Sequence, residues 1–182
     1  MLESAIKNYC SHTADTAIFP GAGTAAGFDY VGLGLIGEAG EVCDLIKKML
    51  RDDDGQMTDV RRLKLVKEIG DVMWYWSETH ACLELDPVLT VEAQQSMMAP
   101  TKTVPAMAKD LGFFAAHIAA VNDVTDMEQR QEALQILACM LKTMVELCED
   151  VNINFVNVLE TNYKKLISRK ERDVLGGDGD NR

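Results

Sequence analysis

The chain has 182 residues, 47% of them hydrophobic, which suffices for one domain with a buried core. Its formal charge of −11 argues against partners that are nucleic-acid polymers or anionic membranes, because both are negatively charged. The five cysteines are odd in number and show no C-x-x-C spacing, so we expect reduced thiols, no zinc site and a cytoplasmic protein. We also expect no signal peptide and no membrane span, because no basic stretch precedes an apolar run and no run is long enough.

Apolar residues recur at helical spacing through most of the chain, and no stretch alternates as a strand would. This pattern predicts an all-α helical bundle. Glycine and proline indicate a loop over residues 19–24 and a break at Ala99-Pro100-Thr101. The expected helices cover about residues 2–17, 26–50, 58–84, 87–98, 104–121, 126–148 and 154–171.

The second expected helix contains four glycines, each of which costs a helix roughly 1 kcal/mol relative to alanine. They are Gly32, Gly34, Gly37 and Gly40. Close approach of a neighbouring helix or of a ligand would explain them. Leu33 and Ile36 of this helix, and Leu63 of the third, are expected on the faces that pack into the core.

Four carboxylates form two pairs, Glu38 with Glu41 in the second helix and Glu68 with Asp71 in the third. Each pair has i, i+3 spacing, which places both members on one face of a helix. The acidic and glycine-containing segment 51–55 indicates a helix end and a turn between the two helices.

Folding the chain back at this turn makes the two pairs level, because Glu38 and Asp71 are equidistant from it, as are Glu41 and Glu68. Carboxylates brought together resist burial unless a cation neutralises them. We therefore predict that all four bind a hard divalent cation, Mg²⁺ or Mn²⁺. The alternative is two solvated helix faces, but the neighbours are Gly, Ala, Ile and Val, not Lys and Arg.

The densest basic patch lies near the C-terminus of the last helix. It comprises Lys164, Lys165, Arg169, Lys170 and Arg172. From the residues alone, this patch is equally consistent with an ordinary helix C-terminus, where the dipole favours cations, and with an anion-binding surface.

A weak internal repeat relates residues 83–89 to residues 151–157 at an offset of 68. A second similarity relates residues 34–36 to residues 112–114. Together they place four uncharged residues opposite the acids: Ala116, Ala119, Ile136 and Cys139. If the repeat is a duplication, the chain is a pseudo-dimer whose second half has lost its acids. The alternative is that any two amphipathic helices align through their apolar periodicity alone.

The segments with the acid pairs, residues 35–42 and 68–75, resemble the two signature segments of the MazG-like all-α nucleoside triphosphate pyrophosphohydrolases. The resemblance extends to residues 16–24, 162–170 and 177–182, and in all covers roughly residues 5–90 and 150–182. The stretch from about 91 to 149 departs from the family pattern. In compact members the helix with the second acid pair leads quickly into an Asn-x-x-Lys helix, whereas here two or more helices intervene.

The resemblance implies one MazG-like domain over residues 1–175 and a C-terminal tail over 176–182. Residues 1–98 form the half with the metal site. Residues 99–175 form the possible degenerate repeat, together with the phosphate-binding helix. Compact members assemble as dimers or tetramers, so a homodimer is the implied assembly, although a covalent pseudo-dimer needs less assembly.

The activity implied by the resemblance is Mg²⁺-dependent hydrolysis of a (d)NTP to a (d)NMP and pyrophosphate, in nucleotide-pool house-cleaning. The four acids would be its catalytic metal ligands, with Glu41 as the alternative candidate for positioning the water. The implied substrate-binding residues are Lys48, Lys64, Tyr75, Asn162, Lys165 and Arg169.

Two alternatives remain open from the sequence. The first is a more specific activity, dUTP or dCTP pyrophosphatase or phosphoribosyl-ATP pyrophosphatase. The second is a non-catalytic helical interaction module with a vestigial site, against which the intact acid set argues. Outside the site, Trp74 and Trp76 are expected to pack in the core, and three histidines are expected to be non-catalytic: His12, His80 and His117.

Overall fold

The computed structural model describes residues 2–97 and 102–176. These residues form the helices α1 (Leu2–Thr13), η1 (Ala14–Thr16), η2 (Ala25–Gly27), α2 (Phe28–Asp52), α3 (Asp59–Cys82), α4 (Pro87–Ser96), α5 (Val104–Ala119), α6 (Met127–Asp150) and α7 (Phe155–Glu171). Within these two ranges there is no strand, which confirms the predicted all-α bundle. The predicted break at Ala99-Pro100-Thr101 and the tail after Gly176 lie outside the described residues.

Polar side chains at the start of several helices accept hydrogen bonds from backbone N–H groups that the first turn leaves unpaired. Asp86 caps α4 by accepting from Val88 N, directly before Pro87 at the first helical position. Asp126 and Asn154 cap α6 and α7 in the same way. The expected helices are therefore found, with ends shifted by a few residues; the largest shift is in α1, whose last turn becomes η1.

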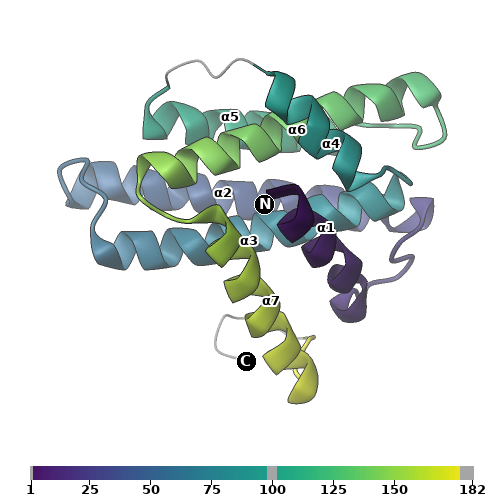
Figure 1. Cartoon of the computed structure of the whole chain (residues 1–182), viewed down its shortest axis with the longest axis horizontal. Coiled ribbons are helices and arrows are strands. Elements are labelled where there is room, and N and C mark those ends of the chain that lie inside the picture. The colour runs from purple at the N-terminus through teal and green to yellow at the C-terminus, as the bar shows by residue number, and fades with distance from the viewer. Residues whose placement is uncertain (1, 98–101, 177–182) are drawn as a thin grey trace.

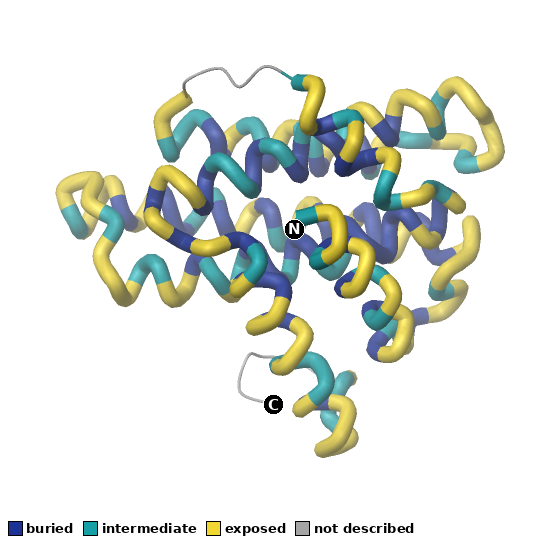
Figure 2. The backbone as a smooth tube through the Cα atoms, viewed as in Figure 1, coloured by how far each residue is buried: buried dark blue, intermediate teal, exposed yellow. Residues whose placement is uncertain are grey.

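Two antiparallel hairpins, α2–α3 and α5–α6, form the body of the bundle, with α5 packed on α2 (Figure 1). The first hairpin turns at Asp54 and Gly55, which both adopt positive φ angles, 50° and 75°. Helix α4 packs on α6, α7 packs across α3, and α1 contacts both α4 and α7. The buried side chains follow the surfaces shared by these helices (Figure 2).

The expected core face of α2 is wrong at two positions. Leu33 is 73% exposed and Ile36 is 42% exposed, and Leu63 of α3 is also exposed. The buried positions of α2 include Val31, Leu35, Ala39 and Val42. These residues lie on the sides of α2 that pack against neighbouring helices, so Leu33 and Ile36 face outward.

The glycines of α2 divide into two classes. A Cβ on Gly34 would lie 2.1 Å from the ring of Tyr75, and one on Gly32 would lie 3.3 Å from Ala119. Close approach of a neighbour therefore explains these two. A Cβ on Gly37 or Gly40 would have no heavy atom within 4 Å, so close packing does not explain them.

The 68-residue offset recurs in the structure. Helix α3 and helix α6 begin 68 residues apart and end 68 residues apart. Each is followed by a residue with positive φ, Glu84 at 52° and Asn152 at 58°, and then by the N-cap of the next helix. These matched positions support the predicted duplication.

Among the helices in the described part of the chain, none combines the length and apolar character that crossing a bilayer requires.

Candidate functional site

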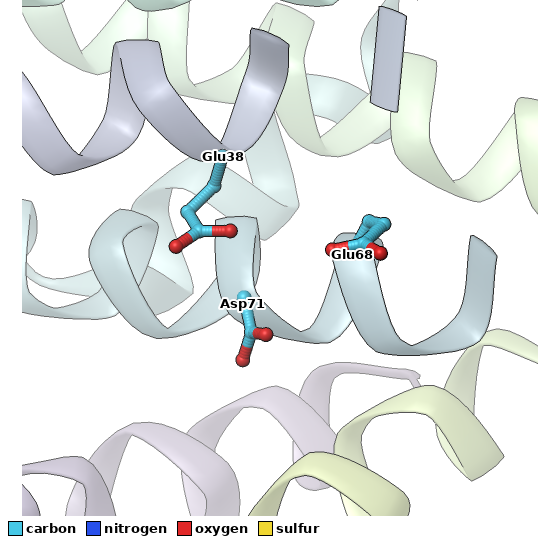
Figure 3. Close-up of side chains that lie close together, drawn as sticks. All are labelled: Glu38, Glu68 and Asp71. Atoms are coloured by element: carbon cyan, nitrogen blue, oxygen red, sulfur yellow. The ribbon is translucent and has the colours of Figure 1, made fainter. Parts of the chain in front are cut away.

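Three of the four predicted acids converge between α2 and α3. Glu38 points from α2 toward Asp71 on α3, and Glu68 lies one turn along α3 (Figure 3). One carboxylate oxygen of each residue lies within 4.8 Å of the others. The antiparallel hairpin thus brings together side chains 30 or more residues apart in the sequence.

Glu41 lies outside this cluster, although it lines the same cavity. Residues three apart differ by about 60° around a helix of 3.6 residues per turn. Glu38 takes the direction that faces α3, so Glu41 is turned toward solvent and is exposed. The prediction that all four acids meet at one point is therefore correct for three of them.

Bringing these carboxylates together is electrostatically unfavourable. Burial raises the pKa of Glu38 to about 7, and the negative charges of Asp71 and Glu68 add to the effect. Lys165 acts in the opposite direction and lowers this pKa. A carboxyl group with so perturbed a pKa, in a cavity, is typical of functional sites.

This pKa has a consequence for folding that can be measured. Because the pKa of Glu38 is higher in the folded than in the unfolded chain, its contribution lowers the free energy of unfolding as pH rises from about 4.5 to about 7. One pKa unit corresponds to about 1.4 kcal/mol, and solvent screening reduces this for a partly exposed group. We expect metal-free Glu38→Gln to be about 1–2 kcal/mol more stable than the wild type at pH 8 and not at pH 4.5. Urea unfolding at both pH values, with exposed Glu92→Gln as the control, tests this; equal stabilities at pH 8 would contradict it.

Helix α7 supplies the groups that contact Asp71. Lys165 Nζ lies 2.6 Å from Asp71 Oδ2 and also contacts Oδ1. Asn162 Nδ2 donates to Asp71 Oδ1 at 2.8 Å, and Tyr9 donates from its hydroxyl to Asn162 Oδ1 at 2.7 Å. The close passage of α7 depends on Gly70, since a Cβ there would lie 2.8 Å from the Asn162 Cβ.

The acids open into a cavity of about 320 Å³ that also has an aromatic wall. The rings of Phe19 and Tyr30 stack with centroids 4.4 Å apart and planes 7° apart. Trp74 and Tyr75 form the adjoining part of the wall, and Trp74 Nε1 donates to Thr16 Oγ1 at 2.9 Å. Along the hairpin, the acids lie nearer the turn and these rings farther from it, so the cavity has a charged part and an aromatic part.

The predicted substrate-binding residues fall into two groups. Tyr75 and Arg169 line the cavity, and Asn162 and Lys165 reach the acid cluster through Asp71. The other two do not line the cavity: Lys64 is exposed, and Lys48 pairs with Asp44 at 2.5 Å. The Lys48 side chain is 46% exposed, and buried Ile46 occupies the opposite side of that turn, so Lys48 lies on the solvent side of α2.

The aromatic wall was largely missed from the sequence. Trp74, expected in the core, is partly buried against the core and also lines the cavity, whereas Trp76 is fully buried as expected. Phe19 and Tyr30 were not predicted as site residues, because one lies in a loop and the other at the start of α2. The sequence feature that could have indicated the wall is the adjacent pair of aromatic residues at 74 and 75, one turn after Asp71.

The histidines lie outside this cavity. His80 is buried, its ring nitrogens contact Trp76 O and Thr90 Oγ1, and burial lowers its pKa to about 4. It is a neutral core residue at pH 7.

The second half of the bundle has an uncharged counterpart of the Asp71–Lys165 contact. Adding 68 to 71 gives Cys139, and subtracting 68 from 165 gives Met97. The sulfur atoms of these two residues lie 3.8 Å apart, so the same helix pairing recurs between α6 and α4. Here a contact between two apolar side chains replaces the ion pair.

The fold and the site thus define an all-α bundle with a carboxylate cluster in an aromatic-walled cavity. The chain is 45% identical over 87 residues to the Gene 37 protein of Mycobacterium phage L5, an alignment spanning 46% of this chain and 75% of that protein. The chain belongs to the same family as that phage protein. No family model matches the chain. No solved structure matches it either.

Proposed function

We propose that this protein is a Mg²⁺-dependent nucleoside triphosphate pyrophosphohydrolase, which converts a (d)NTP and water to a (d)NMP and pyrophosphate. One observation carries the proposal: a cluster of three carboxylates, a buried arginine and an aromatic wall share one cavity. These three features match the three parts of such a substrate complex, namely a cation, a polyphosphate and a base.

The donor set suits a hard divalent cation. Glu38, Glu68 and Asp71 offer oxygen atoms within 4.8 Å of one another, and oxygen ligands are those that Mg²⁺ and Mn²⁺ prefer. Burial, together with the negative charges of Asp71 and Glu68, raises the pKa of Glu38 although Lys165 lowers it, so a further cation would stabilise the ionised cluster. When bound, a divalent cation would neutralise phosphate charge and activate water.

Helix α7 is suited to hold the phosphates. Arg169 is buried at the cavity wall, and its planar guanidinium can donate two parallel hydrogen bonds to phosphate oxygens. Lys165 lies one turn before it on the same face of α7. Phosphoryl transfer depends chiefly on positioning and charge neutralisation, so the site needs no Ser, Cys or His nucleophile.

In the proposed reaction, water adds to the α-phosphorus and the bond to the oxygen bridging to the β-phosphorus breaks, so pyrophosphate leaves. Glu41 lies at the cavity wall outside the cluster and is exposed, so we assign to it the role of orienting the water and accepting its proton. Asn162, fixed by Tyr9, orients the Asp71 carboxylate.

A nucleotide panel scored by pyrophosphate release tests this function. It should contain the four NTPs, the four dNTPs, dUTP and phosphoribosyl-ATP, each with Mg²⁺ and with a chelator. We expect Mg²⁺-dependent pyrophosphate release from at least one nucleotide. Release from dUTP or dCTP alone, or from phosphoribosyl-ATP alone, would identify a specific pyrophosphatase, and no release from any would contradict the proposal.

The aromatic wall gives a second measurable expectation. A base stacked beside Trp74 should change its fluorescence, while Trp76 is buried elsewhere in the core and gives a constant background. Adding a non-hydrolysable α,β-imido nucleotide with Mg²⁺ should therefore change the emission of the wild type. The change should disappear in Trp74→Phe and persist in Trp76→Phe. If Trp74→Phe still showed the emission change of the wild type, the base would bind elsewhere.

A further inference from the structure

The ion pair between Lys165 and Asp71 occupies part of the position that the proposed cation needs. Lys165 Nζ contacts both oxygens of the Asp71 carboxylate, and Asn162 donates to one of them. Asp71 therefore accepts three hydrogen bonds from α7. A carboxylate so engaged has little capacity left for a metal ion, although Glu38 and Glu68 lie within 4.8 Å.

The three contacts on Asp71 differ in how easily they can move. Asn162 is 3% exposed and is held by the hydroxyl of Tyr9 on α1, so it is fixed between two helices. The Lys165 side chain is 24% exposed and ends in a point charge on a flexible four-carbon chain. Lys165 is therefore the member that can leave Asp71 without rearranging the helices.

A displaced Lys165 has a second place to bind. Arg169 lies four residues further along α7, so the two cations share a face of the helix, and Arg169 lines the cavity. An anionic ligand held by Arg169 would lie within reach of the Lys165 ammonium. One lysine thus stands between the carboxylate cluster and the predicted phosphate position.

We propose that Lys165 is a placeholder cation: it neutralises Asp71 in the metal-free protein and transfers to the polyphosphate when a divalent ion binds the acids. This inference rests on the proposed function for the identity of the two ligands. It makes metal and nucleotide binding cooperative, because the metal frees Lys165 for the phosphates and the phosphates draw Lys165 from Asp71. Linkage requires each ligand to strengthen the other by the same factor.

Titration with Mn²⁺, followed by its electron paramagnetic resonance signal, tests the proposal without any turnover. Mn²⁺ is added to the full chain alone and then with the non-hydrolysable α,β-imido nucleotide. In the wild type we expect the nucleotide to raise Mn²⁺ affinity by about tenfold, within the usual range of coupling between sites. In Lys165→Met we expect Mn²⁺ alone to bind several-fold more tightly than in the wild type, and the nucleotide to add little.

The neighbouring lysine provides the matched control. Lys164 is 76% exposed in its side chain and pairs with Glu160 at 3.7 Å, so Lys164→Met should keep both the wild-type affinity and the coupling. Lys165→Gln serves as a second variant that retains a polar group, and circular dichroism checks that both variants are folded. Unchanged or weaker Mn²⁺ binding in Lys165→Met and Lys165→Gln, or full coupling in either, would overturn the proposal. If no nucleotide released pyrophosphate but the expected changes in Mn²⁺ affinity were still observed, the enzyme function would be rejected. Lys165 would then be a placeholder cation for a different anion that binds together with the metal.

Discussion

Replacing Glu38 by glutamine should lower Mg²⁺-dependent nucleotide hydrolysis by about 100-fold or more. Even groups that merely orient metal ligands are commonly worth about 10–100-fold, and Glu38 contributes an oxygen to the cluster itself. The substitution keeps the size of the side chain and removes its charge. The measurement is the steady-state rate of pyrophosphate release at saturating Mg²⁺, together with the Mn²⁺ affinity.

The loss cannot be attributed to unfolding, because we expect the same variant to be more stable than the wild type at pH 8. Glu92→Gln changes an exposed glutamate of α4 in the same way and should keep full activity. Wild-type turnover and Mn²⁺ affinity in Glu38→Gln would remove this residue from the site.

Replacing Gly70 by alanine should separate α7 from the acid cluster. The added Cβ would lie 2.8 Å from the Cβ of Asn162, and that atom is fixed to the backbone of α7, so the helix has to move. Overpacking of this kind costs about 1–3 kcal/mol, partly offset by the better helix propensity of alanine. We expect a lower melting temperature and loss of most hydrolysis, since Lys165, Asn162 and Arg169 move with the helix.

Gly40→Ala is the matched control, because a Cβ there meets no heavy atom within 4 Å. The same change should raise stability by up to about 1 kcal/mol and leave activity unchanged. Thermal unfolding and pyrophosphate release of the two variants, measured side by side, give the comparison. Wild-type stability and activity in Gly70→Ala would show that α7 does not depend on this close approach.

The bundle could be predicted from the sequence because its signals are local. Helical periodicity, the turn at residues 51–55 and the Asp86-Pro87 start of α4 each depend on neighbouring residues. The meeting of Glu38 and Asp71 could also be predicted, because a hairpin with a known turn fixes which residues are level. Neither inference required knowledge of how distant helices pack.

The remaining features depend on packing between distant segments. The outward position of Glu41 follows from which side of α2 faces α3, and the exposure of Leu33 follows from where α5 packs. The wall formed by Phe19, Tyr30 and Trp74 joins a loop and two helices, so no single window of sequence contains it. The hydrogen bond from Tyr9 to Asn162 joins residues 153 positions apart.

The internal repeat shows how sequence and structure complement each other. Its sequence similarity is weak, yet the 68-residue offset aligns Cys139 with Asp71. In the structure, Met97 contacts Cys139 as Lys165 contacts Asp71. Helical periodicity alone would not predict that these two contacts occur at equivalent positions. On this basis each chain is expected to contain one metal site, not two.

We propose above all that the acid cluster and α7 together cleave between the α- and β-phosphates. Phosphorus-31 NMR of a reaction with a nucleotide that the panel identifies, with Mg²⁺ and with Glu38→Gln as the blank, measures this directly. Equal amounts of nucleoside monophosphate and pyrophosphate, formed by the wild type only, are the predicted result. Orthophosphate with nucleoside diphosphate, or equal product formation by the blank, would contradict it.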